Sequence, residues 1–258
     1  MSPVLTQIAW IGRRSILRTL RQPAAIVPAI VFPLFFLVFM AGGLSSVASI
    51  PGFPAPTYLS FALAGAFVQG SMFAGMNGGA DLALDIQTGF INRISLTPIR
   101  GVTLVLGQMF GALGVAFLQG TSYLVYGAIS GVEFQTGLPG ALAILLAGFV
   151  VATAFGTLGA LVAARTGSAE AVQAMFPLFF VFMTFSSFFL PRPMISTRWF
   201  RTIADYNPVS YFIEAIRGLI ISGWSARELT LGLGLASAVS AAGLAGASKA
   251  LKTRLARS

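Results

Sequence analysis

The side chains that most often perform acid-base or metal chemistry are scarce in this sequence. It contains no His and no Cys, and only seven Asp and Glu residues among 258. His is the usual acid or base at neutral pH and the commonest metal ligand, and Cys supplies thiolates and disulfides. Glu133, Asp205 and Glu214 are the candidate acids for a membrane-interface reaction, but no His or metal-binding cluster accompanies them. We therefore expect no catalytic residue and no metal site.

A phosphate-binding loop is missing as well. The stretch GLAGASK, residues 243–249, has glycines and a lysine at the wrong spacing for G-x-x-x-x-G-K-[ST]. The long apolar segments also carry no Asp, Glu, Lys or Arg near their middle, on which proton- or ion-coupled carriers rely. We expect no cofactor in this chain, and a pump built from it needs a partner that supplies the energy.

The composition indicates an integral membrane protein. The chain is 56% hydrophobic and 9% charged, whereas an average soluble domain is about 25% charged. A helix needs about 20 apolar residues to cross the hydrocarbon core. The uncharged windows, divided by the proline-rich turn at residues 51–56, predict one all-α membrane domain over residues 1–258 with six transmembrane helices, near residues 24–46, 58–80, 101–130, 138–163, 171–190 and 229–248.

The basic residues predict the orientation of these spans. Eleven of the sixteen lie in the N-terminal segment, in the connections after the second and fourth spans, and in the C-terminal tail. The positive-inside rule places these segments on the cytoplasmic side, and an even number of spans brings both termini there. A net charge of +9 is also seen in nucleic-acid-binding proteins, but here the charges sit at the ends of apolar windows. We expect membrane lipid, and no nucleic acid, as a partner.

Residues 3–21 are predicted to form an amphipathic helix. At 100° per residue most apolar side chains fall on one half, Trp10 and Leu17 excepted, and the other half carries Arg13, Arg14, Arg18 and Arg21. Such a helix lies in the membrane interface, with its arginines toward lipid phosphates or a protein partner. The alternative is a solvated basic leader that only sets the topology.

The connection after the second span carries a dense motif, DLALDIQTGFINRISLTPIRGVTLVLGQ at residues 81–108. Pro98 forces the preceding residue out of a helix and restarts the chain into the third span. The order of residues resembles a signature of bacterial ABC type-2 exporter permeases, with matches at Asp85, Thr88, Gly89, Arg93, Leu96, Thr97, Pro98, Arg100, Gly107 and Gln108. The resemblance implies that residues 81–100 form the coupling helix that docks into a separate ATPase subunit. On spacing alone, an ordinary loop with a proline turn is the alternative.

A second block, residues 176–220, resembles the other signature of the same family. That signature is an apolar span ending in S-x-x-F-x-P, a proline-rich turn, an amphipathic helix, then N-P and A-x-R. The matching positions are Ser187, Phe188, Phe189, Pro191, Trp199, Phe200, Asn207, Pro208, Glu214, Ala215, Arg217 and Gly218.

The sequence around this block predicts two short helices, at residues 196–204 and 208–222. Asn207 is suited to the N-cap of the second helix, and each helix is too short to span a membrane with its charges. We expect Glu214 to pair with Arg217, and Arg201 with Asp205, on single helix faces. The resemblance favours a re-entrant helical hairpin, residues 191–225, that gates the outer face between spans five and six. An amphipathic cover lying flat on that face is the alternative.

Four polar residues lie inside the predicted spans: Gln69, Asn77, Gln108 and Gln119. They are candidates for a substrate path, or for interhelical hydrogen bonds that hold the bundle together.

The two blocks and the span pattern cover nearly the whole chain and resemble the drug-exporting branch typified by daunorubicin-resistance permeases. The resemblance implies a permease subunit in the bacterial cytoplasmic membrane. Two permease chains, identical or different, would form the pore, and two soluble ATPase subunits would bind ATP and Mg²⁺. Apolar spans without fixed charge suit a hydrophobic or amphipathic drug or lipid. Export of polysaccharide or lipid-linked glycan, a membrane-embedded lipid-modifying enzyme and a scaffold without transport are the alternatives.

Overall fold

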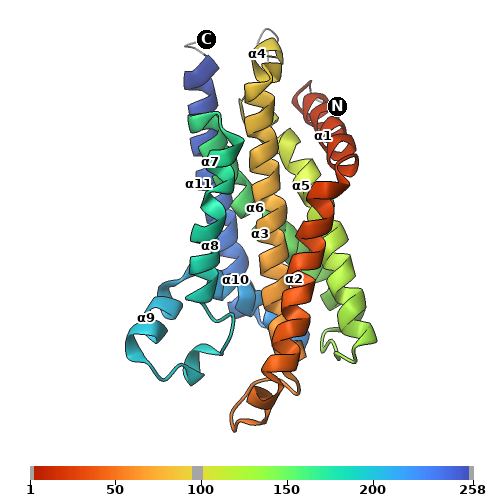
Figure 1. Ribbon diagram of the computed structural model, residues 1–258, viewed down its shortest axis with the longest axis vertical. Helices are drawn as coiled ribbons and strands as arrows, with labels where there is room; N and C mark the ends of the chain where they lie inside the picture. The colour runs from red at the N-terminus through yellow and green to blue at the C-terminus, as the bar shows by residue number, and fades with distance from the viewer. Residues whose placement is uncertain (1–2, 95–100, 256–258) are drawn as a thin grey trace.

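A computed structural model describes residues 3–94 and 101–255, most of which are helical (Figure 1). Five of the helices are long and apolar enough to cross a membrane. They are α2 (Pro23–Gly43), α3 (Tyr58–Gln87), α5 (Gly101–Ile129), α6 (Gly137–Thr166) and α11 (Ala226–Leu255). The shorter elements are α1 (Pro3–Leu20), η1 (Ser45–Ser49), α4 (Phe90–Ile94), α7 (Ala169–Gln173), α8 (Met175–Thr184), η2 (Arg192–Met194), α9 (Arg198–Tyr206), α10 (Pro208–Arg217) and η3 (Gly218–Ser222).

Helix α3 lies at the centre of the bundle and is by far the most buried of the five long helices. Its glycines allow this position because they let neighbouring backbones approach. A Cβ atom at Gly75 or Gly79 would collide with the backbone of α6 at Ala152 and Gly159. Small residues four apart bring membrane helices into close contact in this way. The α3–α6 pair therefore forms the core against which the other helices pack.

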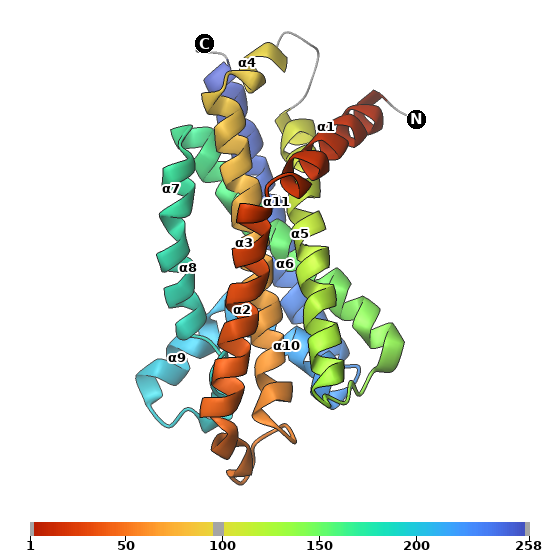
Figure 2. The same cartoon turned by 45° about the vertical axis from the view of Figure 1, so that its right-hand side comes forward.

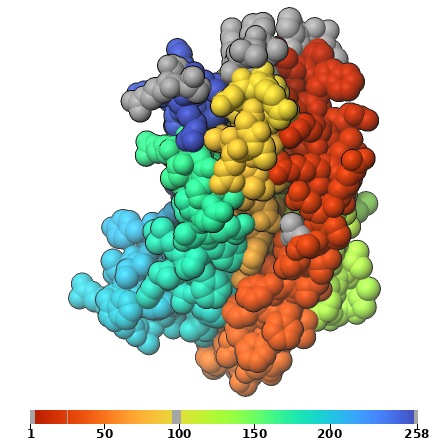
Figure 3. Space-filling view, turned by 45° about the horizontal axis from the view of Figure 1, so that its top comes forward, coloured from red at the N-terminus to blue at the C-terminus, as the bar shows by residue number. Residues whose placement is uncertain are grey.

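The elements divide between two ends of the molecule. Both chain ends, α1 and α4 lie at one end, which we call the termini end (Figure 2). Helix α9, η1 and the α5–α6 connection lie at the other, the distal end. In the space-filling view, the last turns of α3 lie between α1 on one side and the α7 and α11 region on the other (Figure 3). The amphipathic N-terminal helix therefore adjoins the end of the central helix.

The predicted N-terminal helix and five of the six predicted spans are confirmed as helices, with α3 and α11 longer than expected. Helix α3 continues to Gln87, so Asp81 and Asp85 belong to its last turns and not to a separate connection. Gly89 then adopts φ +70°, a left-handed conformation that suits glycine and ends helices. Four residues of the predicted coupling motif lie outside the described residues: Leu96, Thr97, Pro98 and Arg100.

The fifth predicted span, residues 171–190, is wrong as a single helix. Residues 169–184 form the two short helices α7 and α8, and helical structure ends at Thr184. The Asn207 amide Nδ2 donates hydrogen bonds to the carbonyl oxygens of Phe182 and Phe185, at 2.6 and 2.9 Å. These carbonyls are among those that the end of a helix leaves without a partner. Asn207, at the junction of α9 and α10, therefore stabilises the C-terminus of α8, which lies before the predicted end of the span at residue 190.

The two short helices predicted beyond it are confirmed. Helix α9 is followed by α10, which continues as one turn of π-helix in η3. Asn207 Oδ1 accepts the Val209 N–H at 2.9 Å, so the predicted N-cap is confirmed as well. Asn207 therefore caps α8 at its C-terminus and α10 at its N-terminus.

Candidate functional site

A buried carboxylate, Asp85, joins three helices at the termini end. Its side chain is 2% exposed and accepts hydrogen bonds from Arg14, with Nη1 at 2.7 Å and Nη2 at 2.9 Å. Arg18 Nη1 lies 2.7 Å from Oδ1, and Gln108 Nε2 donates to Oδ2. Arg18 Nη2 also lies 3.4 Å from Asp81 Oδ1. We call Arg14, Arg18, Asp81, Asp85 and Gln108 the Asp85 cluster; it links α1, α3 and α5.

Glycines on α5 explain how α1 comes close enough to make these contacts. A Cβ atom at Gly107 would collide with Ile11, and one at Gly111 would collide with the Ser15 hydroxyl. Ser15 Oγ donates to the Gln108 carbonyl at 2.9 Å and accepts from the Gly111 N–H at 3.2 Å. Helix α1 therefore packs directly on the backbone of α5, and its arginines reach the end of α3.

The charges of the cluster compensate one another. A buried carboxylate without a partner costs several kcal/mol, so Asp85 depends on its two arginines and on Gln108. The hydrogen bonds to Asp85 raise the pKa of the Arg14 guanidinium above its usual value, against the effect of partial burial. The Arg14 guanidinium also lies 3.7 Å from the centre of the Phe90 ring. Through this contact α4, which lies within the predicted coupling segment, contacts α1.

The structure brings together residues that the sequence placed in separate groups. Arg14 and Arg18 come from the interfacial helix, Asp85 from the coupling motif, and Gln108 from the polar residues of the spans. Arg13, Arg21 and Arg93 are exposed, and Thr88 forms the turn after α3. Asp81 was missed by the sequence reasoning. Its spacing of four residues from Asp85, on one face of a helix opposite a row of arginines, was the available signal.

A second charged group lies at the distal end and corrects the predicted pairing. Glu214 is paired with Arg192, whose Nε donates to Oε1 at 2.7 Å, and not with Arg217. Asp205 is also paired with Arg192, at 3.6 Å, and not with Arg201. Helical spacing permits the predicted pairs, but the turn after α8 brings Arg192 between both acids. The predicted short-range pairs are therefore wrong, and the pairing links η2 to α9 and α10.

Arg217 is buried where α10 meets α3. Its guanidinium donates to the carbonyl oxygens of Ser187 at 2.8 Å and Phe61 at 3.2 Å, and lies 3.6 Å from the centre of the Phe61 ring. The Phe189 carbonyl accepts from the Tyr58 hydroxyl at 3.0 Å. The backbone carbonyls of Ser187 and Phe189, which follow α8, are thus hydrogen-bonded to side chains of α10 and α3. A cavity of about 400 Å³ beside it is lined in part by Pro191, Glu214 and Arg217.

The predicted gate residues occupy this one region. Ser187, Phe189 and Pro191 follow α8, and Asn207, Pro208, Glu214 and Arg217 lie at or within α10. The Ser187 N–H also donates to the Ser210 hydroxyl at 3.1 Å.

The four polar span residues have different surroundings. Gln108 belongs to the Asp85 cluster. Gln119 Nε2 donates to the Ala29 carbonyl, which Pro33 leaves free because proline has no N–H to bond the residue four positions earlier. Asn77 borders a cavity of about 170 Å³ beside the end of α1. Gln69 is fully buried, and neither atom of its amide has a hydrogen-bond partner in the described part of the chain.

Comparison with known proteins gives the family. The model of the family described as ABC-2 type transporter matches residues 6–221, most of the chain. This chain belongs to the ABC-2 type transporter family. It is therefore a multi-pass membrane protein of a transport family whose members are transporter components and not catalytic enzymes.

Curated relatives agree with this assignment. The "Putative transport permease ycf38" of Porphyra purpurea is 28% identical over 83% of this chain and 74% of its own length. The protein of the same name from Pyropia yezoensis is 27% identical over 88% and 79%. The daunorubicin resistance ABC transporter permease protein DrrB1 of Streptomyces coeruleorubidus is 26% identical over 77% and 69%. The resemblance to this family read from the sequence motifs is thus confirmed.

Proposed function

We propose that this chain is the membrane permease subunit of an ATP-driven exporter and works with a separate soluble ATPase. The observation that carries the proposal is the Asp85 cluster. It joins the interfacial helix α1 to the last turns of α3, within residues 81–100, the segment where the family resemblance implies ATPase docking. A partner can drive a conformational change only by favouring one conformation over another. A force on the segment after Gln87 would act on α1, α3 and α5 together.

The topology in this proposal has six crossings. Helices α2, α3, α5, α6 and α11 each cross the membrane, and α7 with α8 makes the fifth crossing in chain order. Residues 191–225 then form a re-entrant segment at the outer face. Because the basic residues concentrate at the termini end, that end is cytoplasmic, and the bacterial cytoplasmic membrane is the location. Two permease chains and two ATPase subunits form the complex, and the ATPase subunits bind ATP and Mg²⁺.

The substrate is a hydrophobic or amphipathic molecule, such as a drug or a lipid. The long helices carry no fixed charge at mid-depth, and one curated relative is named for resistance to daunorubicin. Export of a polysaccharide or lipid-linked glycan is the alternative within the same family. A lipid-modifying enzyme is less well supported, because Arg192 already pairs with both Asp205 and Glu214.

Reversing the charge of Arg93 tests the coupling role of α4. Arg93 is exposed in α4, beyond the Asp85 cluster, so Arg93→Glu leaves the helix packing intact. We expect the substrate-stimulated ATPase activity of the reconstituted complex to fall about tenfold or more, within the range of coupling free energies of 1–3 kcal/mol. Lys252→Glu, an exposed charge reversal on α11 at the same end, is the matched control and should retain activity. Full activity of Arg93→Glu, or equal losses in both variants, contradicts the coupling role.

A further inference from the structure

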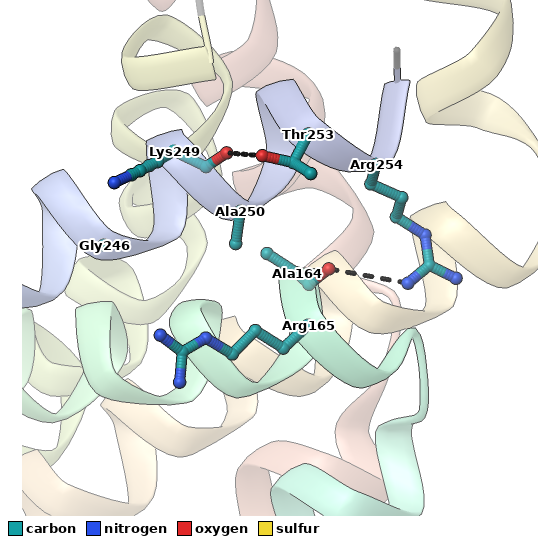
Figure 4. A pocket seen from close by; sticks show the side chains of 7 residues that line it. All are labelled: Ala164, Arg165, Gly246, Lys249, Ala250, Thr253 and Arg254. Carbon is teal, nitrogen blue, oxygen red and sulfur yellow. Dashed lines mark hydrogen bonds between the residues drawn. The ribbon is translucent and has the colours of Figure 1, made fainter. Parts of the chain in front are cut away.

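A basic pocket lies between the last turns of α6 and α11 at the termini end. Its volume is about 550 Å³ (Figure 4). The lining residues are Ala164, Arg165, Gly246, Lys249, Ala250, Thr253 and Arg254. Three of these seven are cationic and none is acidic. None of them belongs to the Asp85 cluster or to the residues that the family motifs single out, so the pocket requires its own explanation.

The positive charge of this pocket is largely uncompensated. Within the described ranges, the side chains of Arg165 and Lys249 have no hydrogen-bond or ion-pair partner, and both are exposed. Figure 4 shows them extending past one edge of the pocket, with Arg254 at the opposite edge. Arg254 Nη1 donates to the Ala164 carbonyl at 3.4 Å. Basic side chains therefore lie on both sides of an open cavity, which the small residues Gly246 and Ala250 also line.

Neutralisation of helix ends explains part of this charge, but not all of it. Helices α6 and α11 both end here, and each C-terminus carries roughly half a negative charge. Arg254 already contacts a carbonyl in the last turn of α6. Arg165 and Lys249 remain as full charges without a contact, so the pocket keeps a net attraction for an anion.

The surroundings of the pocket favour an anion attached to a membrane lipid over a soluble one. The pocket stands at the end of two long apolar helices, the depth at which headgroups lie. Only 17% of the residues in the apolar window of α11 are buried, so one side of this helix is exposed along its length. Basic pockets between membrane helices bind anionic headgroups in this way. A soluble anion would gain nothing from the adjoining apolar face.

We propose that this pocket binds the phosphate of an anionic phospholipid headgroup, held by Arg165 and Lys249, with the acyl chains lying along α11. The bound lipid would link the C-terminal helix to α6. The proposal requires that the chain spans a membrane, but it does not depend on export or on an ATPase partner.

Lipid binding by single-charge variants tests the proposal. The full chain is purified in detergent and titrated with dioleoyl phosphatidylglycerol, and the bound fraction is read by native mass spectrometry. Lys249→Gln should weaken phosphatidylglycerol binding about fivefold, because each basic residue near anionic lipid contributes about 1 kcal/mol. Lys252→Gln, three residues further on α11 and outside the pocket, is the matched control and should change binding less than twofold. Dioleoyl phosphatidylcholine should bind equally to all variants.

Each other outcome of this experiment overturns the proposal. Equal weakening by Lys249→Gln and Lys252→Gln indicates general surface charge, and no weakening by either excludes the pocket. Full competition by submillimolar glycerol 3-phosphate shows a soluble phosphate ligand. Unchanged lipid binding together with loss of a co-purifying ATPase in Lys249→Gln shows a protein contact. Thermal unfolding of each variant in detergent verifies the fold, and Arg165→Gln repeats the test from α6.

Discussion

Asp85→Ala is expected to lower the free energy of unfolding of this protein by about 3 kcal/mol, since removing one partner of a buried ion pair leaves the other charges uncompensated. Arg14 and Arg18 both lose their main partner, and Gln108 loses the acceptor of its amide. Helix α1 should then separate from the end of α3. Denaturant-induced unfolding in detergent micelles, followed by circular dichroism, measures the change.

Asp81→Ala provides the matched comparison for this prediction. Asp81 stands four residues earlier on the same helix, but its one ion pair, with Arg18, is longer at 3.4 Å. Its removal should cost about 1 kcal/mol or less, because a single partly exposed pair contributes little. If Asp81→Ala and Asp85→Ala destabilise the protein equally, Asp85 does not hold the three helices together.

Asn207→Ala is expected to lower the free energy of unfolding by about 2–3 kcal/mol. The loss combines an N-cap, typically about 1 kcal/mol, with two hydrogen bonds to carbonyls at the end of α8, about 1 kcal/mol each. Thermal unfolding in detergent measures it. Asn77→Ala, at a partly exposed asparagine of α3, serves as the same-type control and should change stability by less than about 0.5 kcal/mol.

Asn207→Asp separates the two roles of the side chain. A carboxylate still accepts the Val209 N–H and so keeps the cap of α10, but it cannot donate to the Phe182 and Phe185 carbonyls. We expect this variant to be at least as unstable as Asn207→Ala, because a negative charge would face two carbonyl oxygens. Stability like that of the unchanged protein would show that Asn207 does not determine where α8 ends.

Local patterns in the sequence were sufficient for much of this fold. Uncharged windows gave five of the spans, the alternating apolar and basic faces gave α1, and the Asn207–Pro208 pair gave the start of α10. These features depend on residues close together in the chain, where periodicity and capping act. The fifth span failed because hydropathy does not report hydrogen bonds from a distant side chain. The Asn207 amide that caps α8 lies 22 residues after Phe185.

The sequence was sufficient to single out residues of the candidate site, but not to predict which of them contact one another. The motifs singled out Asp85 and Gln108, and the helix pattern singled out Arg14 and Arg18. Their meeting depends on α1 packing over Gly107 and Gly111 of α5, a tertiary contact that spacing cannot specify. The distal ion pairs failed for the same reason. Arg192 reaches Glu214 through the turn after α8, whereas the sequence suggested partners within one helix.

The measurement that tests the central claim most directly is a cross-link from α4 to a soluble ATPase. The chain has no Cys, so Arg93→Cys introduces a single thiol at an exposed position of α4. A short thiol-reactive photo-cross-linker placed there, in membranes that contain the co-expressed ATPase subunit, should yield a covalent product of the two chains. Arg198→Cys, exposed in α9 at the distal end, should yield none. A product from position 198, or none from position 93 while the two subunits still co-purify, would contradict the account.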